Sequence, residues 1–100
     1  MLDKADGQTF TDHVRLVHAV GMHARPAVKL TKLAKRFQAQ ISVRVAGAAE
    51  WINAKSVAKI MAMRAAHGST IEIQASGSDA EAAVAALVKL IATDFPDEAS

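Results

Sequence analysis

Alternation of apolar and polar residues most constrains the fold of this chain, because it predicts strands that bury only one face. In the first such segment, Val14 and Leu16 alternate with Arg15. The strands are expected at residues 13–19, 41–45, near 50–53 and at 71–75. Strands of this kind leave one face of a sheet in water, so the covering helices are expected on the other face.

Three further segments repeat apolar residues at helical spacing. The first helix is expected at 24–37 and the second at about 56–66. The run Ser78-Asp79-Ala80-Glu81 is typical of a capping box and predicts the start of the third, which ends before Pro96. The order βαββαβα predicts an α+β fold, in which three helices cover one face of a sheet.

Length and composition limit the class of protein. One hundred residues, 51% hydrophobic and 22% charged, suit one small domain, expected at 12–95 with polar tails at 1–11 and 96–100. The absence of cysteine excludes disulfides, thiolate zinc sites and cysteine nucleophiles. No apolar run approaches the roughly 20 residues that a membrane span needs, and the N-terminus lacks the apolar centre of a signal peptide, so we expect a cytoplasmic protein.

The run GMHARPA, residues 21–27, places a histidine where a strand gives way to a helix. Its glycine allows a tight turn, and its proline fits the first helical turn. His23 is therefore expected at the helix N-cap, where its ring would face the backbone N–H groups of Ala24 and Arg25. A neutral imidazole keeps a lone pair and can attack phosphorus, while the Arg25 guanidinium offers planar donors to phosphate oxygens.

Other histidines are given no role by their positions. His13, His18 and His23 are five residues apart, an interval that alternates faces along a strand, so they are not expected to share a metal. His67 lies in a predicted turn. We expect no metal site and no cofactor. His23 itself could merely cap a helix, but Ser, Thr, Asp and Asn cap better, which favours the chemical role.

Two motifs together resemble the HPr family, the histidine-containing phosphocarriers of the bacterial phosphoenolpyruvate-dependent phosphotransferase system. The run 21–27 is similar to the active-site segment of that family, and NAKSVAKIM at 53–61 looks like its second signature. The order of elements also matches from about 12 to 95. The resemblance implies an open-faced sandwich with an antiparallel four-stranded sheet. Arg64 stands where sugar-branch members usually have glycine, and the spelling of the run 21–27 and the long turn at 46–49 are closer to the nitrogen-related branch, often called NPr.

The resemblance also implies a function. His23 would accept a phosphoryl group from phosphorylated enzyme I and pass it to a histidine of an enzyme IIA domain, with Arg25 assisting. The protein would be a carrier and not an enzyme, and any magnesium would belong to its partners. Ser56 is expected to cap the second helix, and the resemblance adds regulatory phosphorylation by an HPr kinase/phosphorylase; both roles stay open.

The second helix has an apolar stripe that is expected to stay exposed near His23, because Ile60 and Met63 fit its inward face. We call this stripe and its neighbouring lysines the second-helix patch, which consists of Val57, Ala58, Met61, Ala62, Lys55 and Lys59. Its apolar centre and basic rim predict a docking surface for an acidic protein partner. With one Trp, three Phe and no Tyr, the chain is not expected to bind nucleic acid, and we expect a monomer.

Two other interpretations remain. One is a regulatory HPr-like protein that binds partners through the second helix without phosphoryl transfer. The other is an unrelated α+β module for a small ligand or RNA that shares the layout by chance. Transfer from enzyme I to His23 separates the first of these from a phosphocarrier, and the presence of both motifs argues against the second.

Overall fold

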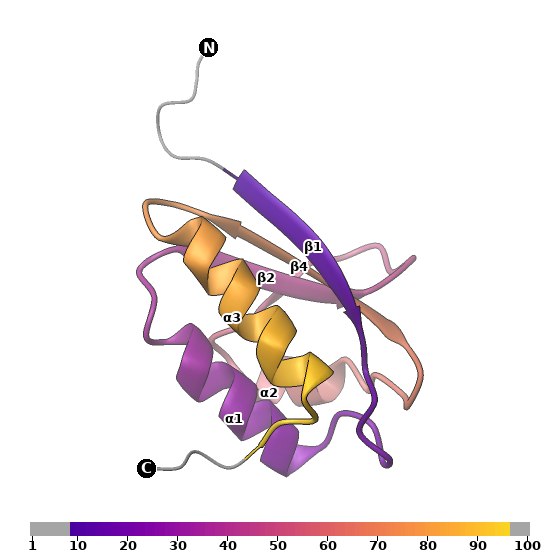
Figure 1. Ribbon diagram of the computed structural model, residues 1–100. Coiled ribbons are helices and arrows are strands. Elements are labelled where there is room, and N and C mark those ends of the chain that lie inside the picture. Colours follow the sequence, from indigo (N-terminus) through magenta and orange to yellow (C-terminus); the bar gives the residue numbers. More distant parts are fainter. Residues whose placement is uncertain (1–8, 97–100) are drawn as a thin grey trace.

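The computed structural model describes residues 9–96 and confirms the predicted order of elements (Figure 1). The elements are β1 (Thr9–Arg15), α1 (Ala24–Ala34), β2 (Gln40–Val45), β3 (Ile52–Asn53), α2 (Val57–Ala62), β4 (Thr70–Ser76) and α3 (Ala80–Ala92). The strands form one antiparallel sheet in the order β1-β4-β2-β3. Within the described residues, no helix combines the length and the apolar character needed to cross a membrane.

The hydrophobic core lies between the sheet and the helices. Along β4, Ile71, Ile73 and Ala75 are buried, and the residues between them are half-buried. Leu30 of α1 and Leu87 of α3 are fully buried against this face. The alternation in the sequence therefore reflects a sheet with one covered face and one open face, which confirms the expected layers.

The first strand begins and ends earlier than predicted. It starts at Thr9, where it pairs with Ser76, and it ends at Arg15 opposite Thr70. The length of β1 is thus set by its pairing with β4, which local alternation cannot reveal. Residues 9–11 of the predicted N-terminal tail belong to this strand, and the rest of that tail, like residues 97–100, lies outside the described residues.

Two helices are shorter than predicted. The first ends at Ala34 and not at residue 37. The second ends at Ala62, followed by Met63 as the C-cap, because Arg64 has a left-handed backbone with φ of 52°. The Arg64 N–H donates to the Met61 carbonyl, a bond typical of a helix end. Glycine is the usual residue in that conformation, so an arginine gave no stop signal in the sequence.

The predicted capping box at 78–81 is wrong. The N-cap of α3 is Asp79, whose side chain makes no capping hydrogen bond. Its carboxylate instead accepts hydrogen bonds from the backbone N–H groups of Gln38 (2.9 Å) and Ala39 (2.8 Å). Asp79 therefore fastens the connection between α1 and β2 to the start of α3. The bond from Gln38 stabilises the ionised carboxylate most, and it lowers the pKa of Asp79 below the ordinary value of 3.8.

Asp79→Asn is expected to remove part of the acid sensitivity of the fold. Because the folded-state pKa of Asp79 is lowered, its contribution to the free energy of unfolding is present above the ordinary value of 3.8. That contribution is lost as the pH falls through the lowered folded-state pKa. Urea unfolding of both proteins from neutral to acidic pH should show a stability difference that shrinks on acidification. A difference that is the same at every pH would contradict this assignment.

Candidate functional site

The turn before α1 places His23 at the N-cap of that helix, as predicted. The His23 backbone is extended there, with φ of −137° and ψ of −165°. The preceding Gly21 has φ of 77°, and its N–H donates to the His18 carbonyl at 3.0 Å, which closes the turn. The Met22 N–H donates to the Ala65 carbonyl at 2.8 Å, so the chain after α2 holds this turn in place.

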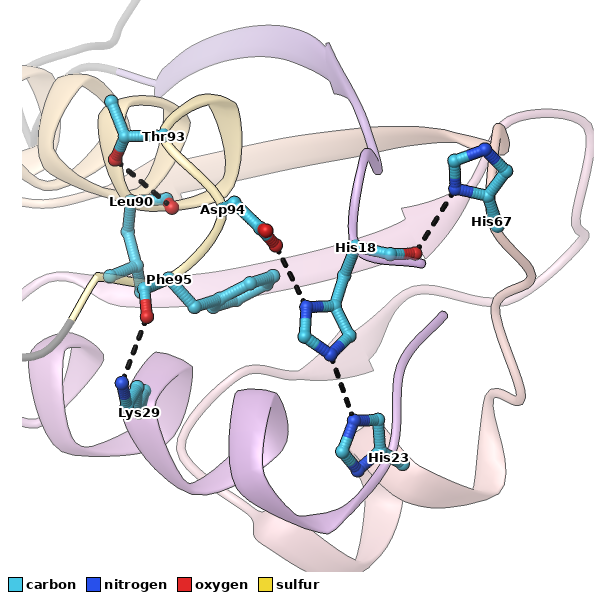
Figure 2. Close-up of polar contacts among 8 residues, drawn as sticks. All are labelled: His18, His23, Lys29, His67, Leu90, Thr93, Asp94 and Phe95. Carbon is cyan, nitrogen blue, oxygen red and sulfur yellow. Dashed lines mark hydrogen bonds and ion pairs between the residues drawn. The ribbon is translucent and has the colours of Figure 1, made fainter. Parts of the chain in front are cut away.

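The His23 ring is turned toward a second histidine. His23 makes no side-chain hydrogen bond that caps α1. Its Nε2 atom is hydrogen-bonded to Nε2 of His18 at 3.0 Å, and the two ring centroids are 5.0 Å apart (Figure 2). The other ring nitrogen, Nδ1, takes no part in this hydrogen bond. The half-buried His23 ring is therefore anchored through one nitrogen.

An aspartate at the end of α3 completes this arrangement. The Nδ1 atom of His18 is 2.7 Å from Oδ1 of Asp94, and the His18 and Phe95 rings are perpendicular with their centroids 6.1 Å apart (Figure 2). The His18 side chain is 25% exposed and that of Asp94 is 53% exposed. The structure therefore brings together the side chains of His23, His18 and Asp94 in one hydrogen-bonded network.

Sequence reasoning missed His18 and Asp94. The argument from strand alternation does not apply to His18, because β1 ends at Arg15 and the turn at residues 19–21 reverses the chain. Asp94 lies 76 residues after His18, so its approach depends on how α3 packs. One signal was present in the sequence: Asp94 and Phe95 follow the third helix, at positions where glycine commonly ends a helix.

The first turn of α1 presents backbone donors next to His23. The Ala27 N–H donates to the His23 carbonyl at 3.0 Å, and Pro26 has no N–H. The amides ahead of this first helical bond belong to Ala24 and Arg25, both exposed. The first turn contains no acidic residue. The N-terminus of α1 therefore offers a positive dipole end to an anion.

The other two histidines have structural partners. His13 follows Asp12 on β1, where the His13 N–H donates to the Asp12 carboxylate at 2.7 Å. The Nδ1 atom of His67 donates to the His18 carbonyl at 3.1 Å, and so helps to hold the backbone of His18 (Figure 2). Neither is placed at a helix N-cap.

The second-helix patch is exposed for the most part. Met61 is 40% exposed, and Ala58, Ala62 and Lys59 are also exposed, whereas Ile60 is buried as predicted. Two members differ from the expectation. Val57 is half-buried and packs against the core, and the half-buried Lys55 donates from Nζ to the Phe37 carbonyl at 2.8 Å.

Ser56 is the N-cap of α2, as expected, and its Oγ accepts a hydrogen bond from the Lys59 N–H at 3.3 Å. The hydroxyl thus has a structural role already. A regulatory role would have to use the same oxygen atom.

Comparisons with known proteins agree with this fold. The family model described as "PTS HPr component phosphorylation site" matches residues 10–93. The phosphocarrier protein HPr of Treponema pallidum (strain Nichols) is 38% identical over 90 residues, which cover 85% of this chain and 94% of that protein. The phosphocarrier protein NPr of Escherichia coli (strain K12) is 34% identical over 90 residues, or 90% of this chain and 99% of that protein.

Solved structures show the same architecture. The crystal structure of HPr-C-His from Thermoanaerobacter tengcongensis superposes with a TM-score of 0.80 at 34% identity, over 89% of this chain and 98% of that one. The expected open-faced sandwich is thereby confirmed. Sequence, fold and family model agree over nearly all of the described residues: the chain belongs to the HPr family of phosphocarrier proteins of the phosphotransferase system.

Proposed function

We propose that His23 accepts a phosphoryl group from phosphorylated enzyme I and donates it to a histidine of an enzyme IIA protein. The observation that carries this proposal is the position of His23, at the N-cap of α1, with Nε2 engaged by His18 and Nδ1 left for chemistry. Membership of the phosphocarrier family supports it.

The chemistry follows from the N-terminus of α1. The Nδ1 lone pair of His23 attacks the phosphorus of the donor phosphohistidine, and a new N–P bond forms as the donor N–P bond breaks. The electrons of the broken bond return to the donor nitrogen. The phosphoryl oxygens then lie near the amides of Ala24 and Arg25, and near the Arg25 guanidinium. Ala24 and Arg25 are exposed, so the group is held loosely enough to leave again.

Incubation with enzyme I, phosphoenolpyruvate and magnesium tests the first half of this proposal. Intact-mass measurement should show one added phosphoryl group, which acid removes and alkali preserves, as expected for phosphohistidine. The regulatory interpretation predicts binding to partners without this product. No uptake, in a mixture where another HPr protein is phosphorylated, would contradict the proposal.

We further propose that the second-helix patch docks enzyme I. Met61→Glu places a charge at the centre of the patch and is expected to weaken binding to enzyme I at least tenfold, about 1.4 kcal/mol. The melting temperature should change little, because the Met61 side chain is 40% exposed. Titration calorimetry measures the affinity, with Ala85→Glu, on an exposed position of α3, as the matched control.

An unchanged affinity for Met61→Glu would place the docking surface elsewhere. Val57→Glu is a poorer test, because Val57 packs against the core and its replacement is expected to destabilise the fold as well.

Regulatory phosphorylation of Ser56 remains a separate proposal. The half-buried hydroxyl caps α2 beside the patch, so a phosphate there would add about 1.5 to 2 negative charges to the docking surface. Such charge is expected to repel an acidic partner. Treatment with an HPr kinase/phosphorylase and ATP, followed by mapping of the modified residue, decides whether Ser56 is a substrate or only a cap.

A further inference from the structure

We propose that His18 and Asp94 are positioning residues that keep the proton of His23 on Nε2 and so leave the lone pair on Nδ1. This inference rests on the proposed role of His23 as the phosphoryl acceptor. It assigns a function to two residues that lie far apart in the sequence and meet only in the folded chain.

The donors and acceptors that Asp94, His18 and His23 can offer determine the tautomer of each histidine. An ionised carboxylate can only accept hydrogen bonds, so His18 must donate from Nδ1 to Oδ1 of Asp94, 2.7 Å away. A neutral imidazole has one N–H, which leaves a lone pair on Nε2 of His18. The Nε2 atom of His23, 3.0 Å from that lone pair, must then be the donor. His23 therefore carries its proton on Nε2, and its Nδ1 is the nucleophilic nitrogen.

The end of α3 is built to hold Asp94 in this place. The Phe95 N–H donates to the Leu90 carbonyl at 2.8 Å and the Asp94 N–H to that of Ile91 at 3.1 Å, the paired bonds of a Schellman motif. Asp94 is its C′ residue, with φ of 62°, where glycine is usually found. The left-handed conformation is less favourable for aspartate than for glycine, but aspartate at this position places a carboxylate against His18.

Neighbouring contacts hold both His18 and the loop that carries Asp94. The Nζ atom of Lys29 donates to the Phe95 carbonyl at 2.8 Å and so ties the loop after α3 to α1 (Figure 2). His67 donates to the His18 carbonyl, and the buried Phe95 ring packs perpendicular to the His18 ring. The position of His18 is therefore fixed by contacts to its backbone, to its ring and to Asp94.

The arrangement also assists the transfer step. When the Nδ1 lone pair of His23 forms the N–P bond, the His23 ring gains positive charge while its Nε2 proton stays in the hydrogen bond to His18. The Asp94 carboxylate, acting through His18, stabilises that charge. When the group leaves, the bonding electrons return to Nδ1 and no proton has to be exchanged with water. A carboxylate that orients a histidine in a catalytic triad works by the same principle.

Nitrogen NMR of the uniformly labelled protein tests this inference without any partner. In long-range proton–nitrogen spectra, Nδ1 of His23 and Nε2 of His18 are expected to show the shifts of nitrogens with lone pairs. Their ring partners are expected to show protonated shifts. A His18 ring protonated on both nitrogens, or a His23 ring protonated on Nδ1, would overturn the proposal.

Asp94→Asn is the decisive variant, because asparagine also tolerates the left-handed backbone. The asparagine amide can donate to Nδ1 of His18, which moves the His18 proton to Nε2 and the His23 proton to Nδ1. We expect the His23 nitrogen shifts to reverse, and the rate of phosphoryl uptake from enzyme I to fall at least about tenfold. Wild-type shifts together with a wild-type rate would overturn the proposal.

Further variants separate positioning from folding. Asp94→Gly supplies the usual residue for the helix end, so the fold should be at least as stable while the His23 tautomers average. His18→Gln keeps an acceptor for the His23 Nε2–H and should retain more transfer activity than His18→Leu. If wild-type tautomers are found but no phosphoryl group is taken up, the proposed function fails and the tautomer assignment stands. If uptake occurs and none of these variants alters the tautomers or the rate, the assignment fails and the function stands.

Discussion

His23→Ala is expected to abolish phosphorylation by enzyme I and phosphoenolpyruvate while the fold remains intact. Among the residues that the structure describes, His23 is the histidine at a helix N-cap, and its side chain forms no cap bond that the helix would lose. Alanine removes the nucleophilic nitrogen, so the expected effect on uptake is complete loss and not a slower rate. Intact-mass measurement after incubation reports the uptake, and circular dichroism reports the fold.

His13→Ala is the matched control for this result. His13 is exposed and lies on β1, where its backbone N–H donates to the Asp12 carboxylate. This variant should still take up one phosphoryl group. Label on a histidine of the His23→Ala protein would show that the acceptor has been assigned to the wrong residue.

Gly21→Ala is expected to destabilise the fold by about 2 to 5 kcal/mol. Gly21 has φ of 77°, a conformation that costs residues with a side chain roughly 1 to 2 kcal/mol. A Cβ atom there would lie 2.6 Å from the Ala65 carbonyl oxygen, and relief of such a clash costs about 1 to 3 kcal/mol more. The backbone of this turn would have to move away from Ala65, and His23 would move with it. Urea unfolding measures the loss.

Gly47→Ala separates the two contributions. Gly47 also has a positive φ, of 91°, but a Cβ atom there would meet nothing within 4 Å. The control should therefore lose only the conformational cost, about 1 to 2 kcal/mol. Equal losses for the two variants would show that contact with the Ala65 carbonyl does not constrain the turn before His23.

Periodicity in the sequence predicted the fold well because burial of alternate residues determines which layers form. Ile71, Ile73 and Ala75 are buried in β4 as their alternation indicates. Element ends were less predictable, since they depend on other parts of the chain. The extent of β1 is set by its partner strand, and α2 stops at a left-handed arginine that carries no local signal.

The residues of the candidate site also differ in how far local sequence could predict them. His23 and its N-cap position were predicted from a short run of residues whose glycine and proline fix the local backbone. His18 and Asp94 were not, because their contact requires the turn at 19–21 and the packing of the end of α3. A local motif was enough to predict the proposed acceptor, whereas the proposed orienting groups are brought to it by tertiary packing.

Onward transfer is the most direct test of the claim that this protein is a carrier. The protein is phosphorylated with radioactive phosphoenolpyruvate and enzyme I, separated from both, and mixed with an enzyme IIA protein. If the protein is a carrier, label leaves His23 and appears on a histidine of enzyme IIA, faster than it is released as inorganic phosphate. Label that stays on His23, or is lost only to water, would show that the protein does not pass the group on.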